Sequence, residues 1–202
     1  MNARERRRDV VVAGHLRDPD TVLRHLDDPD PGVRVAALGG AERLGVLADR
    51  QIVTAFSDSA APVRRRAAEL AGTRPAISLL ALLTDRDASV VETAAWACGE
   101  QVAVDDDVLD LLIDLTTTAD DPLVREAAAA ALGAIGDPRG LPAILSACTD
   151  KPQIRRRAVL ALAPFDGDEV ETAIDTALED RDWQVRQAAE DLRRAAGELD
   201  LG

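Results

Sequence analysis

The stretch DDPLVREAAAAALGAIGDPRGLPAIL, residues 120–145, decides the fold of this chain. It starts with an acidic turn and Pro122, continues through Val124 into a run of alanines, and reaches Gly133. Proline fits the first turn of a helix, where its missing N–H leaves no hydrogen bond unmade. Apolar residues recur four, five, seven and eight positions after Val124, on one face of a helix that Gly133 is predicted to end. The stretch therefore predicts a helix that begins near Val124, and a further helix over residues 141–148.

The same arrangement occurs six times along the chain. Each copy has an acidic or proline-bearing turn, a branched residue, usually an arginine, and then an alanine-rich run; the branched residues are Val33, Val63, Val90, Val124, Ile154 and Val185. Shorter apolar stretches precede them and predict the first helix of each pair, over residues 20–26, 50–56, 76–83, 108–115, 141–148 and 170–178. Because one such unit cannot bury its apolar face alone, the copies are expected to stack.

These repeats predict an all-α fold, a right-handed α-solenoid (superhelix) of about six stacked antiparallel helix pairs. Residues 1–19 are expected to form an N-terminal capping helix, and residues 20–202 the repeats, with the last helix as a polar C-terminal cap. The composition agrees, because 47% of the residues are hydrophobic but only 2% are aromatic. Such a core suits closely packed small helices better than a β-sandwich, which uses aromatic and β-branched strands.

The motif of an aspartate, Val-Arg, Ala-Ala and Leu-Gly resembles the HEAT repeat. It is most similar to the short variant first described around phycobilin lyases, and the similarity covers about residues 20–196. The third copy departs most from the pattern, because Val91 stands in place of the arginine and Trp96 in place of a small residue. The resemblance implies that an aspartate and an arginine of each copy form a ladder through the turns: Asp28 with Arg34, Asp58 with Arg64, Asp120 with Arg125, Asp150 with Arg155 and Asp180 with Arg186.

Aspartates also precede each branched residue as turn formers. We expect them to cap the second helices, because Asp is favoured both in turns and at helix N-caps. The six residues are Asp28, Asp58, Asp85, Asp120, Asp150 and Asp180.

The charge of the chain restricts its partners. Thirty-seven acidic residues against 24 basic ones give a formal net charge of −13. An acidic surface argues against nucleic acid or an anionic membrane as the main partner. The apolar run near the N-terminus is too short for a secretory signal, and no stretch approaches a membrane span. We therefore expect a monomeric, cytoplasmic protein.

No motif in the sequence indicates catalysis. The two histidines, His15 and His25, lie in no metal-binding pattern, and the chain has neither a phosphate-binding glycine loop nor a nucleophile motif. Cys98 and Cys148 lie in apolar helical stretches and are expected to be buried, reduced thiols. We predict no catalytic residue, no metal and no cofactor.

The second helices are expected to line a concave face that binds a partner. Counting 100° per residue from each branched residue, the sixth position lies opposite the core and the second and third lie on its shoulders. Trp96 occupies the sixth position of the third copy, and aromatic and arginine residues are enriched at interface hot spots. The residues predicted to bind a partner are Trp96, Arg65, Arg66, Glu92, Glu126, Arg156 and Arg157.

Two functions remain open at this point. The first is a non-catalytic interaction module, a scaffold or adaptor, that binds a protein or peptide along the concave face. In its sharpest form Trp96 is the apolar anchor, and the four arginines pair with an acidic or amphipathic segment. The alternative, implied by the resemblance alone, is an accessory subunit or lyase/chaperone acting on a chromophore-bearing or modified protein. A DNA glycosylase built of similar repeats fits poorly with the net charge. Whether Trp96 is exposed or packed between repeats also stays open.

Overall fold

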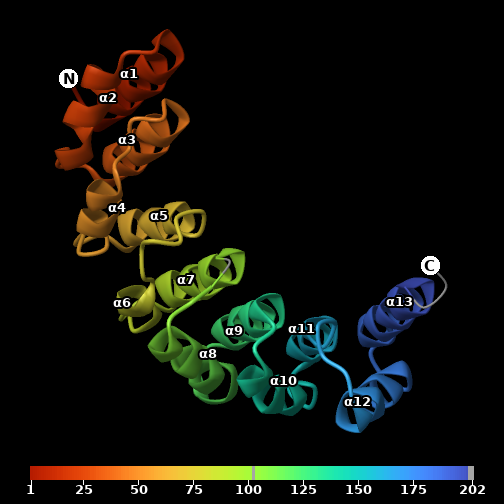
Figure 1. Ribbon diagram of the computed structural model, residues 1–202. Coiled ribbons are helices and arrows are strands. Elements are labelled where there is room, and N and C mark those ends of the chain that lie inside the picture. Colours follow the sequence, from red (N-terminus) through yellow and green to blue (C-terminus); the bar gives the residue numbers. More distant parts are fainter. Residues whose placement is uncertain (102, 200–202) are drawn as a thin grey trace. The chain divides into compact units, whose positions relative to one another are not determined.

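A computed structural model describes residues 1–101 and 103–199 of the chain. Every regular element among these residues is a helix, and no strand occurs in them. The chain divides into two compact units, residues 1–94 and 95–202, and the boundary falls within a single helix, α7 (Ala88–Glu100). Each unit is built of stacked helix pairs (Figure 1), so the α-solenoid class predicted from the repeats is confirmed.

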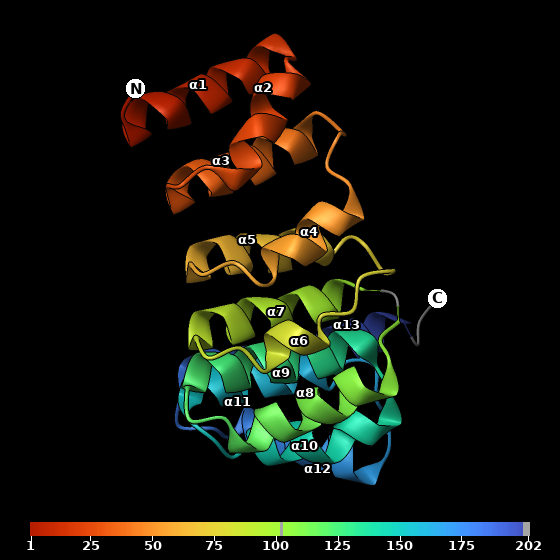
Figure 2. The ribbon, with the colours of Figure 1, turned by 90° about the vertical axis from the view of Figure 1, so that its left-hand side faces the viewer.

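The first unit contains the helices up to the middle of α7. They are α1 (Ala3–Leu16), α2 (Pro19–Arg24), a 3-10 turn (His25–Asp27), α3 (Pro31–Arg43), α4 (Asp49–Ala55), α5 (Ala61–Ala71) and α6 (Leu80–Leu83). The second helices of the pairs stack directly, since α1 contacts α3 and α3 contacts α5. Figure 2 shows them in successive layers, with α4 beside α5.

The second unit begins within α7 and repeats the same construction. Its helices are α8 (Asp106–Thr118), α9 (Pro122–Ile135), a 3-10 turn (Pro138–Gly140), α10 (Leu141–Ala147), α11 (Pro152–Ala161), α12 (Asp168–Leu178) and α13 (Trp183–Leu199). Helix α9 packs against α11, and α11 against α13. Within this unit α9, α11 and α13 form an inner row, and α8, α10 and α12 an outer row (Figure 1). No helix in the described part of the chain is long and apolar enough to cross a membrane.

The helix starts follow the predicted pattern, with one correction. Proline lies in the first turn of α3, α5, α9 and α11, where its geometry is already helical. The side-chain caps of α3 and α9, however, are Asp30 and Asp121. The predicted caps Asp28 and Asp120 lie further from the helix start, beyond the reach of its first N–H groups.

The predicted end of α9 was also wrong. The helix runs through Gly133 to Ile135, and Gly136 ends it with a left-handed φ of 70°. Gly133 serves packing instead, because a Cβ there would lie 2.5 Å from the Cα of Ala161 on α11. In the same way, a Cβ at Gly99 of α7 would lie 3.1 Å from the Cα of Ala131 on α9. Small residues thus let the second helices of this unit stack at short distance.

Replacing Gly133 with alanine should destabilise the protein. The added methyl group meets backbone atoms that cannot turn away, and overpacking of this kind costs about 1–3 kcal/mol. Gly197→Ala is the matched control, since nothing lies within 4 Å of a Cβ there and alanine favours a helix by about 0.5–1 kcal/mol. Urea unfolding of both variants tests this expectation, and equal stability of the two would contradict it.

Candidate functional site

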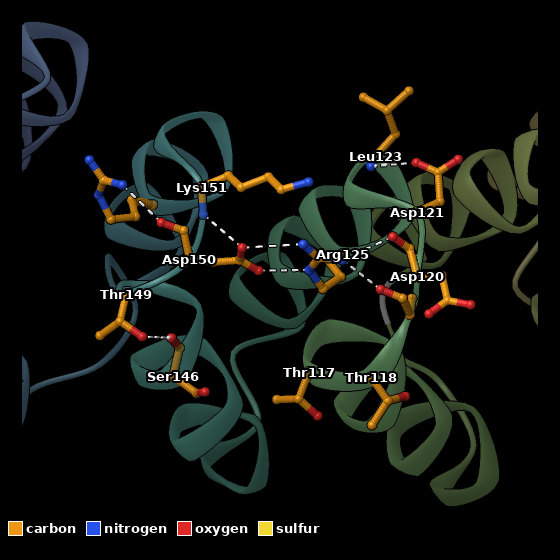
Figure 3. Close-up of polar contacts among 12 residues, drawn as sticks. Thr117, Thr118, Asp120, Asp121, Leu123, Arg125, Ser146, Thr149, Asp150 and Lys151 are labelled. Atoms are coloured by element: carbon orange, nitrogen blue, oxygen red, sulfur yellow. Dashed lines mark hydrogen bonds and ion pairs between the residues drawn. The ribbon is translucent and has the colours of Figure 1, made fainter.

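An arginine on each of four second helices, α3, α5, α9 and α11, joins two consecutive turns. In Figure 3, Arg125 of α9 extends toward Asp150, which lies in the turn before α11. Its Nε and Nη2 donate to the two carboxylate oxygens at 2.6 and 3.2 Å, and its Nη1 donates to the Ala119 carbonyl at 2.6 Å. One guanidinium therefore holds the turn of its own repeat and the turn of the next one. We call this two-turn bridge a rung.

Four further rungs have the same geometry. The five pairs are Arg6–Asp28, Arg34–Asp58, Arg64–Asp85, Arg125–Asp150 and Arg155–Asp180. The ladder implied by the resemblance therefore exists, but its carboxylates pair with the arginine of the preceding repeat. Within one copy, Arg34 reaches only the backbone carbonyl of Asp28, at 2.7 Å, and Arg186 reaches that of Asp180 in the same way.

The aspartates of the rungs also shape the turns. The Oδ1 atoms of Asp28, Asp58 and Asp85 each accept a hydrogen bond at 2.9 Å from the backbone N–H two residues later. This Asx turn uses the same oxygen that the arginine approaches, so the carboxylate is fixed from two sides. The turn role predicted for these residues is confirmed, whereas their capping role is not.

Two irregularities of the ladder trace to single residues. Arg6 supplies the first rung from α1, and its partner Asp28 also fixes the first turn, so α1 carries the ladder position of a second helix. Sequence reasoning missed this role of Arg6. The signal was a spacing: Arg6 lies four residues before the buried Val10, as Arg34 lies four residues before the buried Leu38. In the third copy Val91 cannot donate to a carboxylate, and the Asp120 side chain makes no hydrogen bond within the described residues.

Trp96 is exposed on the second-helix face of the second unit. Its side chain is 38% exposed, and the guanidinium of Arg157 lies 4.9 Å from the centre of its ring. The Arg157 Nε also lies 3.7 Å from Glu126 Oε1. These residues come from α7, α11 and α9. Three residues predicted to bind a partner are thus brought together, and we call them the Trp96 cluster.

The Trp96 cluster does not include the other residues that were predicted to bind a partner. Arg156 points away from the cluster, toward α13, where it lines a groove described below. Arg65, Arg66 and Glu92 belong to the first unit. Arg65 is exposed, Arg66 donates to Glu69 at 2.6 Å, and Glu92 is half-buried. The charges of Arg66 and Arg157 are therefore already paired within the chain.

With this geometry described, comparison with known proteins identifies the repeats. The sequence model of a family described as HEAT repeats matches residues 77–163. Over these residues the chain is similar to HEAT repeats. Their match spans the third to fifth copies of the motif. A comparison with curated protein sequences finds no match.

Solved structures show the same fold. A designed armadillo repeat protein in complex with the peptide (KR)4 has a TM-score of 0.63 and 16% identity, over 88% of this chain and 98% of that one. A chain from the complex of CpcE and CpcF of phycocyanin lyase, from Nostoc sp., has a TM-score of 0.62 and 22% identity, over 73% of this chain and 64% of that one. YibA from E. coli has a TM-score of 0.62 and 21% identity, over 84% and 67% respectively. At these identities the likeness shows the fold alone.

The described part of the chain holds few groups suited to catalysis. Burial raises the pKa of the Cys98 thiol to about 12, and that of Cys148 likewise to about 12, so neither is a thiolate near neutral pH. His15 is exposed, and His25 Nδ1 lies 2.8 Å from the Thr21 carbonyl oxygen. Within residues 1–101 and 103–199, no three His, Cys, Asp or Glu side chains are placed to hold a metal ion. This architecture of repeats is typical of non-catalytic, protein-binding scaffolds.

The most buried rung of the ladder should be the most costly to break. The side chains of Arg64 and Asp85 are only 6% and 7% exposed. Arg64→Ala leaves the Asp85 carboxylate buried without its cation, so the free energy of unfolding should fall by about 3 kcal/mol. Arg194→Ala, which removes the exposed pair with Asp191, should change it by no more than about 0.5 kcal/mol. Denaturant titration measures both, and a similar small loss for both variants would remove the ladder from the account.

The ladder should also make stability depend on acid pH. Hydrogen bonds from Arg64, Arg125 and Arg155 hold the pKa values of Asp85, Asp150 and Asp180 below their usual range, against the opposing effect of burial. A carboxyl with a lowered pKa in the folded state stabilises the fold above its unfolded pKa of about 4, and this contribution is lost as the pH falls further. The free energy of unfolding should therefore drop below about pH 4.

Asp85→Asn provides the control for this acid dependence. The amide carries no charge at any pH, so the variant should lose less stability than wild type between neutral pH and about pH 3. Unfolding curves at several pH values give both slopes. Parallel curves for the two proteins would show that Asp85 does not contribute to the pH dependence.

Proposed function

We propose that this protein is a non-catalytic interaction module that binds a protein or peptide segment on the inner face of its second unit. The observation that carries the proposal is the exposed Trp96 within the Trp96 cluster. Its neighbours on α7, Ala95, Ala97 and Cys98, are small and buried. A large aromatic residue on the outward side of such a helix exposes apolar area that a partner can cover.

The surroundings of Trp96 support a preorganised anchor. Arg157 packs on one face of the indole, and Glu126 lies close to the Arg157 Nε, so the ring is held in one orientation before any partner arrives. A rigid aromatic loses little conformational entropy on binding, and tryptophan is among the residue types that dominate interface energies. The rest of the indole remains accessible to an apolar side chain of a ligand.

Proteins of the same fold support a binding role. The designed armadillo repeat protein is seen with a peptide, and CpcE is seen in complex with CpcF. The alternative, an accessory subunit or lyase/chaperone for a chromophore-bearing or modified protein, draws support only from the shared fold with a phycocyanin lyase subunit. Binding is therefore the function that the described side chains favour. The proposal extends to Arg65, Arg66 and Glu92 of the first unit as further residues that contact the partner, and to a monomeric protein in the cytoplasm.

The Trp96→Ala variant tests this function. Peptides from a random display library are first selected on the immobilised full chain, and their affinities are measured by calorimetry. Trp96→Ala should weaken the selected peptides by about 30-fold, equivalent to about 2 kcal/mol, because it removes a hot-spot aromatic. Its thermal midpoint should change little, since the side chain is exposed.

Val53→Ala is the control for this experiment. Val53 is an exposed apolar residue on α4, a first helix, and truncating it should leave the affinities unchanged. Selected peptides that bind wild type and Trp96→Ala equally well would contradict the proposed function. So would a library that yields no binder at all.

A further inference from the structure

A groove lies between α11 and α13, next to the Trp96 cluster. It has a volume of about 260 Å³ and is lined by Arg156, Leu160, Trp183, Gln187, Ala188 and Asp191. All of these residues belong to the second unit. Arg156 and Arg157 are consecutive residues of α11, so their side chains leave the helix about 100° apart and point to different neighbours. Arg157 faces the Trp96 cluster and Arg156 faces the groove.

The groove contains one cation without an internal carboxylate. The Nε of Arg156 is buried and has no hydrogen-bond partner among the described residues, and the side chain forms no ion pair there. The acidic residue of the groove, Asp191, is already used by its own helix, since its Oδ1 accepts from Gln187 at 2.9 Å and from Arg194 at 3.1 Å. A guanidinium with unused donors binds carboxylates through charge-assisted hydrogen bonds. The polar part of the groove therefore favours an anionic group.

The groove also presents two large apolar side chains. Trp183 is 65% exposed at the start of α13, and Leu160 is 39% exposed on α11. Leu160 holds the sixth position of its repeat, the position of Trp96 in the third copy. Two exposed apolar residues beside an unpaired arginine suit an amphipathic segment. The apolar pair can cover an apolar side chain of that segment, and the arginine can pair with one of its anionic groups.

We propose that the groove binds a segment of a partner protein in which a carboxylate side chain lies next to an aromatic or large aliphatic one. The carboxylate pairs with Arg156, and the apolar side chain packs between Leu160 and Trp183. The inference rests on the proposed function, to which it adds a second subsite and the chemistry of the ligand. It excludes a basic segment as the ligand of this groove, because a second cation beside Arg156 would be repelled.

Three synthetic peptides test the proposal on the full chain. DEFLDEFL combines acidic and apolar residues, KKFLKKFL reverses the charge, and DESGDESG lacks the apolar residues. The protein carries two tryptophans, so Trp96→Phe leaves Trp183 as the single emitter and its fluorescence reports on the groove. DEFLDEFL should shift this emission, whereas the other two peptides should bind at least ten-fold more weakly.

Variants then assign the interaction to the groove. Calorimetry, which needs no tryptophan signal, measures these variants in the wild-type background. Arg156→Gln should weaken DEFLDEFL about 10-fold or more, as expected for a lost charge-assisted hydrogen bond, and Trp183→Ala should weaken it similarly. Both side chains are at the surface of the fold, and the thermal midpoint of each variant confirms that it is folded. Arg50→Gln removes an exposed arginine of α4, a first helix, and should leave the affinity within about two-fold of wild type.

Several outcomes would overturn the inference. They are equal binding of KKFLKKFL, binding of DEFLDEFL that is unchanged in Arg156→Gln, and failure of DEFLDEFL to bind. In each case the proposed function still stands if library-selected peptides depend on Trp96. It fails separately if they do not. A self-association that Trp183→Ala abolishes would assign the groove to a second copy of the chain and would also refute the inference.

Discussion

A single arginine on each of α3, α5, α9 and α11 joins two turns, and the regular stacking of these helices depends on this contact. The guanidinium has enough donors to reach a backbone carbonyl in its own turn and both oxygens of an aspartate in the next, as Arg34 does with Asp28 and Asp58. The aspartate in turn fixes its own loop through an Asx turn. Each rung therefore fixes the start of one second helix relative to the turn of the following repeat. Lysine could not replace the arginine, because it lacks the planar fork that binds a carboxylate through two parallel hydrogen bonds.

Close packing of the second helices complements the ladder. Alanine and glycine bring α9 and α11 so near that Gly133 has no room for a methyl group. With the core side of each helix occupied by small residues, large side chains such as Trp96, Leu160 and Trp183 stand out on the exposed surface. Because small residues pack the helices together, the few large exposed residues are the first candidates for binding a partner.

Much of this fold could be predicted from the sequence, because it is local and repeated. The helix pairs, the prolines of their first turns and the identities of the ladder residues all follow from one motif at a regular spacing. The pairing in the ladder did not, because residues close in sequence suggested partners within one copy, whereas Arg64 pairs with Asp85 of the next. The residues of the Trp96 cluster were predicted separately, because they hold the second, third or sixth position after the branched residue of their copies. The groove was missed because Trp183 lies two residues before the branched residue of its copy, and only positions after the branched residue were considered.

The ladder and the binding surface meet on α11, where Arg155 forms a rung, Arg156 lines the groove and Arg157 packs on Trp96. Three consecutive arginines thus have three different environments, because successive residues of a helix point about 100° apart, and the bond from Arg155 to Asp180 fixes one of these directions. A double-mutant cycle on Arg155 and Asp180 tests that claim most directly. If the rung couples neighbouring repeats, replacing each by alanine, singly and together, should give an interaction energy of about 1–3 kcal/mol. An interaction energy near zero would show that the two residues stabilise the fold independently, and would contradict the account.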